Sequence, residues 1–306
     1  MARILFMGTP EYARRILELI AAPSHRFLVL SKPDVPVGRH RRVTPSPVSC
    51  WALSQGMELL RPARLLDEAQ AIHAFQPDYL LTAAFGRILR PWLLNAPRFG
   101  AYNLHASLLP RWRGPNPVAW AIRAGDSVSG VTLMAMDEGI DTGPIVAQAR
   151  LPIELEDTRA SLTEKMADLG AHLWQETLRR YPYQAWPVTP QSPEGIKFAP
   201  KFGAEEARID WSRDAVQIDA HIRSLAPEPG AYALLGPQHL KILEAKTESA
   251  IMEGPPGRLV SAASHWLVAC GQGVLRILAV KAPGRRTMAP GDYLRGYRGD
   301  FEWMLH

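Results

Sequence analysis

Three side chains near the middle of the chain have the types needed to move an acyl group: the amide of Asn103, the imidazole of His105 and the carboxylate of Asp141. Asn103 and His105 are two residues apart, so on a β-strand both side chains leave the same face. An amide can hold a developing oxyanion, an imidazole can move a proton near neutral pH, and a carboxylate can orient the imidazole or take a proton from an attacking amine. We therefore predict an acyl-transfer site in which these three groups converge.

Turn-forming and small residues surround this set. Ser107-Leu108-Leu109-Pro110 follows His105 and is expected to form a loop of small and apolar residues. Asp141 lies in the segment 137–143, where two glycines in five residues indicate backbone that approaches a ligand closely. This segment resembles a calcium-binding loop, but Gln148 stands where that loop needs a glutamate, so we predict no metal site.

Apolar segments alternate with amphipathic ones along the first part of the chain, which indicates an α/β domain with a mainly parallel sheet. Ligands of such sheets bind beyond the carboxyl ends of the strands, where Asn103 and His105 would stand. The expected strands are 3–7, 27–30, 79–84, 101–105, 131–137 and 143–152, and the expected helices are 11–20, 46–55, 117–123 and 158–181.

The pattern changes in the last third of the chain. The Pro-rich segment 182–203 is predicted to be extended. After it, a helix near 212–225 precedes short strands separated by Gly and Pro, which is typical of a small β-barrel. These strands are expected at 231–235, 239–246, 257–260, 266–270 and 274–281. We therefore predict a catalytic domain over 1–186, a linker over 187–205 and a C-terminal domain over 206–306.

Composition limits the class of protein. The chain has 306 residues, enough for one large or two medium domains, and only two cysteines, which disfavours a disulfide framework or a Cys-based zinc site. No apolar stretch reaches the roughly 18 residues of a membrane span, and the apolar run after Met1 is too short for a signal peptide. We therefore expect a cytoplasmic protein without a membrane contact.

The positive charge is modest, at a formal +5, so its placement matters more than its size. A long Pro-rich loop at 32–47 is basic, and further basic residues follow in the linker and late in the C-terminal domain. Together these groups could follow a phosphate backbone. The residues predicted to contact a nucleic acid are Arg39, Arg41, Arg42, Lys197, Lys201, Arg285 and Arg286.

The first turn of the chain, Gly8-Thr9-Pro10, does not have the spaced glycines of a dinucleotide site. Pro10 and Ala13 occupy the positions of the second and third glycines, counting from Gly8, which disfavours a nicotinamide cofactor.

Over nearly its whole length the chain resembles the folate-dependent formyltransferases, and among them the methionyl-tRNA formyltransferases. This resemblance implies a Rossmann-like formyltransferase domain followed by a C-terminal OB-type barrel. The segments that carry it are 6–13, 33–39, 45–48, 103–114, 136–143, 205–211 and 223–227.

The resemblance also implies an activity: the formyl group of 10-formyltetrahydrofolate passes to the α-amino group of methionine on initiator tRNA. It implies direct attack by the amine through a tetrahedral intermediate, with Asn103, His105 and Asp141 as the catalytic residues and no metal. The residues expected to line the folate site are Phe85, Gly86, Ile88, Leu89, Ser107, Leu108, Leu109, Pro110, Asp137, Glu138, Gly139 and Ile140.

Two alternatives remain open from the sequence. The acceptor could be a small amine such as an amino-sugar nucleotide, because the Asn103, His105 and Asp141 set is specific for the chemistry and not for the acceptor. The protein could also bind RNA through an inert transferase domain, although the intact catalytic set argues against this. We expect a monomer.

Overall fold

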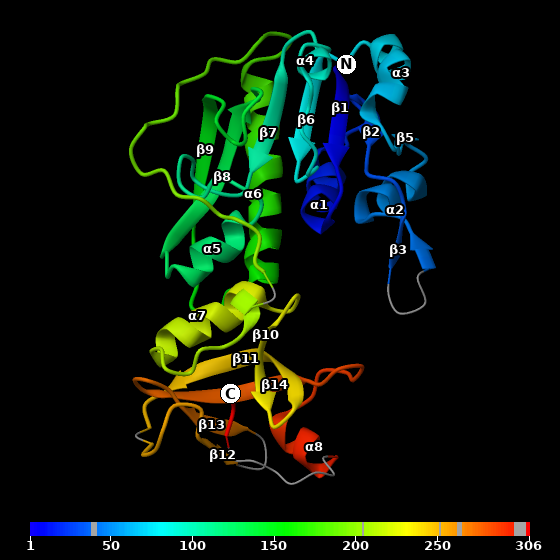
Figure 1. Ribbon diagram of the computed structural model, residues 1–306. Coiled ribbons are helices and arrows are strands. Elements are labelled where there is room, and N and C mark those ends of the chain that lie inside the picture. The colour runs from blue at the N-terminus through cyan, green and yellow to red at the C-terminus, as the bar shows by residue number, and fades with distance from the viewer. Residues whose placement is uncertain (38–41, 204, 251, 262–264, 297–303) are drawn as a thin grey trace. The chain divides into compact units, whose positions relative to one another are not determined.

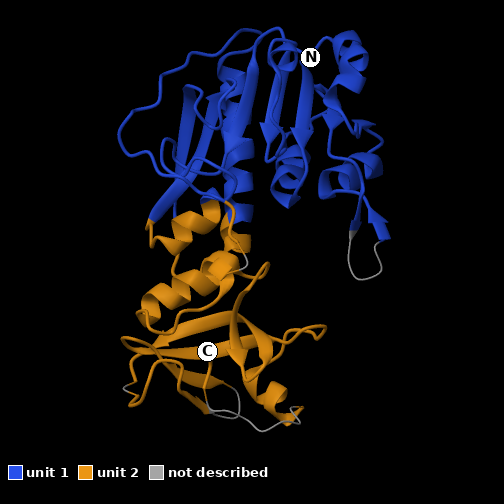
Figure 2. Ribbon diagram, viewed as in Figure 1, with its two compact units in different colours: residues 1–117, 128–152, 163–200 blue, residues 118–127, 153–162, 201–306 orange. Residues whose placement is uncertain are grey.

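The computed structural model describes residues 1–37, 42–203, 205–250, 252–261, 265–296 and 304–306 (Figure 1). The chain forms two units (Figure 2). Unit 1 comprises residues 1–117, 128–152 and 163–200, and unit 2 comprises residues 118–127, 153–162 and 201–306. No described helix combines the length and the apolar character that crossing a membrane requires.

Unit 1 is built on a seven-stranded sheet in the order β5-β2-β1-β6-β7-β8-β9. The five strands from β5 to β7 in this order run parallel to one another, whereas β8 runs antiparallel to both β7 and β9. The predicted α/β fold with a mainly parallel sheet is therefore confirmed. The strands are β1 (Arg3–Gly8), β2 (Arg26–Leu30), β5 (Glu58–Leu60), β6 (Tyr79–Ala83), β7 (Ala101–His105), β8 (Val128–Ala135) and β9 (Ile145–Pro152).

Helices cover this sheet and explain why its central strands read as continuous apolar runs. On α1 the residues at helical spacing, Tyr12, Ile16 and Leu17 among them, are buried as expected. Gly170 of α6 lies against Val131 and Leu104, so this helix packs on β8 and β7. The helices that belong wholly or mainly to unit 1 are α1 (Glu11–Ile20), α2 (Pro47–Ser54), η1 (Leu65–Glu68), α3 (Ala69–Phe75), α4 (Pro91–Leu94) and α6 (Arg159–Arg180).

The chain between β2 and β6 departs from the sequence prediction. The basic loop at 32–47, predicted without regular structure, contains a short hairpin of β3 (Val35–Val37) and β4 (Arg42–Thr44). The edge strand β5 and the helix α3 were not predicted. β5 has only three residues, too few to show a periodic pattern.

The Pro-rich segment after α6 packs within unit 1 as far as Pro200. Trp186 stacks on Tyr102 and Tyr79, with ring centroids 4.3 and 5.2 Å away, and lies edge-on to Trp174 at 5.0 Å. Its indole ring holds the start of the segment against β6 and β7. The boundaries predicted at 186 and 206 stay a prediction.

Unit 2 contains an antiparallel five-stranded sheet in the order β10-β11-β14-β13-β12. Leu305 forms a bridge to Leu235 of β10, and Met304 forms one to Arg258 just before β12, so the last residues join the two edge strands. This closure confirms the predicted small barrel. The elements are α5 (Pro117–Arg123), η2 (Glu205–Ala207), α7 (Ala215–Leu225), β10 (Ala231–Leu235), β11 (Gln238–Glu248), β12 (Leu259–Ser261), β13 (Trp266–Ala269), β14 (Val274–Lys281) and α8 (Pro290–Arg295).

Candidate active site

The candidate site lies at the carboxyl end of β7, where the parallel part of the sheet meets the antiparallel part. In the strand register Asn103 lies opposite Thr82 on β6 and Met134 on β8, and His105 ends the strand. Ligands of open α/β sheets bind beyond the carboxyl ends of the parallel strands, and β7 is one of these. The predicted placement of Asn103 and His105 on one strand face follows from this register.

The amide of Asn103 has a defined orientation. The hydroxyl of Thr82 donates to Oδ1 of Asn103 over 2.7 Å. That contact assigns Oδ1 as the acceptor end, so Nδ2 is the end that can donate to a ligand. Among the residues that the structure describes, none accepts a hydrogen bond from Nδ2. Asn103 therefore offers two amide protons to an incoming oxygen.

The imidazole of His105 is buried and contacted at both nitrogens. Nε2 lies 2.9 Å from the main-chain oxygen of Trp112, and Nδ1 lies 3.5 Å from Oδ1 of Asp141. A carbonyl oxygen can only accept, so Nε2 carries a proton. A second proton on Nδ1 produces an imidazolium that faces the carboxylate. His105 and Asp141 thus form the pair that the sequence predicted.

Asp141 is held in a left-handed backbone conformation, with φ of 53°. Its Oδ2 accepts a hydrogen bond of 2.8 Å from the main-chain nitrogen of Gly114. Two residues later a Cβ on Gly143 would lie 1.9 Å from the main-chain oxygen of Ala135, so only glycine fits there. These contacts fix the turn that aims the carboxylate at the imidazole.

Gln191, which lies in the Pro-rich segment, stabilises this turn through hydrogen bonds. Its Nε2 donates to the main-chain oxygens of Asp141 and Gly143 over 2.9 and 2.8 Å. Its Oε1 accepts from Nη2 and Nε of Arg113 over 2.7 and 3.1 Å. The main chain of Arg113 in turn pairs with Lys197 and Ala199. The segment predicted as a linker thus contributes a residue to the site. No periodicity in its sequence indicates this role.

A second pair of unpredicted residues supports the loop 107–110. Gln148 donates to the main-chain oxygen of Leu109 and to the hydroxyl of Thr132, each over 2.9 Å. Thr132 accepts from the Leu109 main-chain nitrogen and donates to the Ser107 oxygen. Thr132 and Gln148 are cross-strand neighbours on β8 and β9, which the sequence could not reveal before the register was known.

The residues predicted to line the folate site fall into two groups. Four of them have buried side chains that pack in the interior of unit 1: Phe85, Leu89, Ser107 and Leu109. The other eight residues are half-buried or exposed: Gly86, Ile88, Leu108, Pro110, Asp137, Glu138, Gly139 and Ile140. Their contact with a folate stays a prediction.

The basic residues predicted to contact tRNA lie at the surface where they are described. Arg39 and Arg41 fall outside the described residues. The other five are exposed: Arg42, Lys197, Lys201, Arg285 and Arg286.

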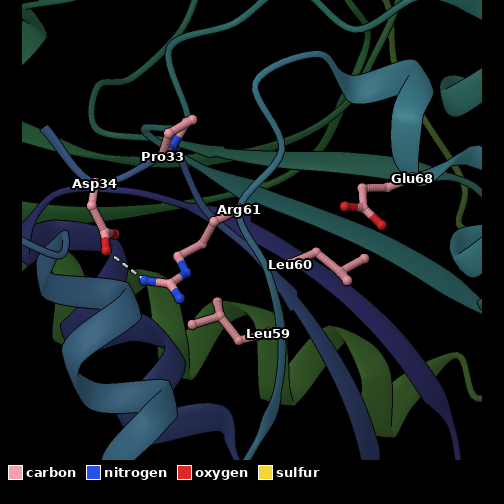
Figure 3. Close-up of a pocket in the computed structure, with 6 residues that line it drawn as sticks. All are labelled: Pro33, Asp34, Leu59, Leu60, Arg61 and Glu68. Carbon is pink, nitrogen blue, oxygen red and sulfur yellow. Dashed lines mark hydrogen bonds and ion pairs between the residues drawn. The ribbon is translucent and has the colours of Figure 1, made fainter.

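A cavity of about 390 Å³ lies elsewhere in unit 1, at the carboxyl ends of β2 and β5 (Figure 3). Asp34 and Arg61 point toward one another across it and form an ion pair of 2.6 Å. Its lining includes none of Asn103, His105 or Asp141. We therefore do not assign the acyl-transfer chemistry to it.

The geometry of the set suits chemistry at a carbonyl carbon. The amide protons of Asn103 can meet a negative oxygen, and the pair of His105 and Asp141 can hold or move a proton nearby. All the groups that support this set, including Thr82 and Gln191, belong to unit 1.

Family comparisons agree with this geometry. The model described as "Formyl transferase" matches residues 2–178, and the one described as "Formyl transferase, C-terminal domain" matches residues 201–298. A methionyl-tRNA formyltransferase from Delftia acidovorans is 43% identical, with 96% of this chain and 94% of that protein covered. One from Aromatoleum aromaticum is 44% identical at the same coverage.

Solved structures share the fold at low identity. HypX from Aquifex aeolicus, in complex with tetrahydrofolic acid, aligns with a TM-score of 0.69 at 19% identity over 96% of this chain, which spans 47% of HypX. The sugar 3N-formyl transferase WlaRD, in the presence of dTDP and 5-N-formyl-THF, aligns with a TM-score of 0.68 at 17% identity, covering 94% of this chain and 99% of WlaRD. The resemblance noted from the sequence is confirmed, and the chain belongs to the formyl transferase family.

Proposed function

We propose that the protein transfers the formyl group of 10-formyltetrahydrofolate to the α-amino group of methionyl initiator tRNA. The chemistry is supported by the convergence of Asn103, His105 and Asp141 at the end of β7. The acceptor is supported by two relatives named methionyl-tRNA formyltransferase, which are 43% and 44% identical. Each of them covers 96% of this chain, so the match includes both the N-terminal and the C-terminal parts. This function implies a cytoplasmic location, and we retain the expectation of a monomer.

The folate supplies a formyl carbon that is open to attack by a neutral amine. As the amine attacks, negative charge develops on the formyl oxygen. Nδ2 of Asn103 can donate to this oxygen, because Thr82 already occupies Oδ1. Protonated His105, on the same face of β7 as Asn103, adds positive charge that favours the negative formyl oxygen.

Asp141 acts on the proton side of the reaction. Its carboxylate holds the imidazolium of His105 through Oδ1, while Oδ2 is held by Gly114. As the new C–N bond forms, the attacking nitrogen becomes acidic and loses a proton to the carboxylate of Asp141. The tetrahedral intermediate then collapses: the C–O double bond re-forms, the bond between the formyl carbon and N10 of the folate breaks, and N10 takes up a proton and leaves as tetrahydrofolate. These steps need neither a covalent enzyme intermediate nor a metal.

We place the folate against the loop 107–110, the turn 137–140 and the segment 85–89, all of which lie in unit 1. The turn 137–140 is ordered by Asp137, whose carboxylate accepts hydrogen bonds from Gly139 and Thr142. The tRNA is proposed to contact a set of basic residues: Arg39, Arg41, Arg42, Lys197, Lys201, Arg285 and Arg286.

A direct assay tests this proposal and its alternative. Purified protein is given 10-formyltetrahydrofolate with methionyl initiator tRNA, elongator methionyl-tRNA or an amino-sugar nucleotide. We expect formylation of the initiator tRNA and little of the other two. Preferred formylation of the amino sugar would support the small-amine alternative, and a protein that binds RNA without binding folate would support the inert domain.

A further inference from the structure

Unit 2 contains a cavity of about 160 Å³ that plays no part in the proposed chemistry. Its lining residues come from the last turn of α5, the segment after η2 and α7, and all of them belong to unit 2. We name it the α7 cavity. Its lining residues are Arg123, Arg208, Asp210, Arg213, Gln217, Ile218 and His221.

His221 is the most unusual of these residues, because its side chain is 5% exposed and both ring nitrogens lack a hydrogen-bond partner among the described residues. Ala207 lies nearby but outside hydrogen-bond geometry. A buried polar group without a partner costs free energy, so native structures rarely keep one unless water or a ligand meets it. The ring lines the cavity and can donate to a ligand within it.

Arg123 presents a second unpartnered donor. Its Nη1 is buried and makes no hydrogen bond to a described residue. The guanidinium stands over the rings of Phe202 and Trp120, at 5.1 and 5.4 Å from their centroids, and these two rings stack on one another. The aromatic pair therefore holds a positive charge in place at the wall of the cavity.

The charges around the cavity favour an anion. Three guanidinium groups, those of Arg123, Arg208 and Arg213, face one lining carboxylate. That carboxylate, on Asp210, accepts hydrogen bonds at Oδ1 from the main chain and the hydroxyl of Ser212. A second carboxylate, on Glu206, lies close enough to act on Arg123. Three positive guanidinium groups against these two negative carboxylates leave a net positive charge around the cavity.

We propose that the α7 cavity is a binding site for a phosphate group. A tetrahedral oxyanion has several acceptor oxygens and can meet the planar guanidinium groups and the His221 ring from different sides. The volume is many times what one water needs. Two sources share this chemistry: a backbone phosphate of the tRNA, which rests on the proposed function, and free inorganic phosphate, which does not.

The first experiment titrates inorganic phosphate alone into the full-length protein at low salt and follows the His221 ring by NMR. Burial and the neighbouring Arg123 lower the pKa of His221 to about 4, and a bound phosphate must raise that pKa. We expect a saturable shift of the His221 resonances. Absence of any shift at His221 up to tens of millimolar phosphate, together with an unchanged tRNA result below, would overturn the proposal.

Variants make this titration specific. Arg213 is exposed, so Arg213→Met should fold normally and weaken phosphate binding about tenfold, the effect expected for one charge-assisted hydrogen bond. Arg213→Lys should restore part of the affinity, because it keeps the charge but not the fork. Arg295→Met, on α8 and outside the lining of the cavity, is the matched control and should leave binding unchanged. Equal affinity in all four proteins would contradict the site.

A second experiment identifies the source of the phosphate group. Binding of uncharged initiator tRNA is measured against salt concentration, with neither folate nor formyl transfer involved. If an RNA phosphate occupies the cavity, the negative slope of log K against log salt becomes shallower by about one in Arg213→Met. An unchanged slope with intact phosphate binding assigns the cavity to free phosphate. Failure of the formyl-transfer assay would leave either result standing.

Discussion

The hydroxyl of Thr82 on β6 donates to Oδ1 of Asn103 on β7 over 2.7 Å, and this contact sets which end of the amide faces the site. The two residues are register partners in the parallel sheet. Asn103 can donate to an oxyanion only if its acceptor end is held elsewhere. The orientation of the proposed catalytic amide therefore depends on a residue that does not touch the substrate.

Replacing Thr82 tests this dependence. Thr82→Val keeps the shape of the buried side chain but removes the hydroxyl, so the amide of Asn103 can turn over. We expect kcat to fall about tenfold while KM for tRNA changes little, because one oriented hydrogen bond is lost in the transition state. Thr82→Ser should keep most of the activity. Wild-type kcat in Thr82→Val would show that the amide needs no such support.

The charge of Asp141 is tested by Asp141→Asn. Asn tolerates the left-handed backbone at this position and is nearly the same size, so the turn should persist. The variant loses the negative charge beside His105 and the ability to accept a proton. We expect kcat to fall roughly 100- to 10,000-fold. The thermal midpoint of unfolding, measured in parallel, should stay near that of the wild type, and a large drop there would mean that activity was lost through unfolding.

Gln191 is expected to matter for both stability and rate. Gln191→Leu removes the hydrogen bonds to Asp141, Gly143 and Arg113 while keeping the volume. We expect unfolding to become easier by about 1–3 kcal/mol, the usual cost of unsatisfied polar groups, and kcat to fall as the turn loosens. The matched control is Gln175→Leu on α6, whose amide donates to Leu19. If both variants behaved alike in kcat, Gln191 would have no special role.

His221 predicts a pH dependence of stability in phosphate-free buffer. Its pKa is lowered to about 4 by burial, with repulsion from Arg123 and Arg213 adding to the effect and the nearby main chain of Ala207 opposing it in part. Below about pH 6.5 the unfolded chain binds a proton that the folded chain refuses until about pH 4. The free energy of unfolding should therefore fall as the pH falls through this window, by up to roughly 3 kcal/mol.

Urea unfolding of the wild type and of His221→Gln at pH 7 and pH 5 measures this effect. The variant should lose much less stability between the two pH values than the wild type does. His172→Gln, at an exposed position on α6, should retain the wild-type slope. Parallel slopes in all three proteins would contradict the buried neutral state of His221.

The sequence predicted best where apolar periodicity and chain length agree. The strand Ala101–His105 and the helix Glu11–Ile20 have the bounds that their patterns indicated. The hairpin at Val35–Val37 and the strand Glu58–Leu60 were missed, because three residues carry no readable period.

The supporting residues of the site were missed for a different reason. Thr82 lies within an apolar strand, and Gln191 lies in a Pro-rich segment 50 residues after Asp141. Their roles depend on strand register and on where an irregular segment returns. Neither can be deduced from local composition, whereas residue type and spacing indicated the role of Asn103, His105 and Asp141.

The central claim is that Asn103 supplies the amide protons that stabilise the formyl oxygen as its charge develops. The most direct measurement is the single-turnover rate of formyl transfer to methionyl initiator tRNA by Asn103→Ala at saturating substrates. We predict a rate roughly 100- to 1,000-fold below that of the wild type with the fold intact. A rate within twofold of the wild type would contradict the account.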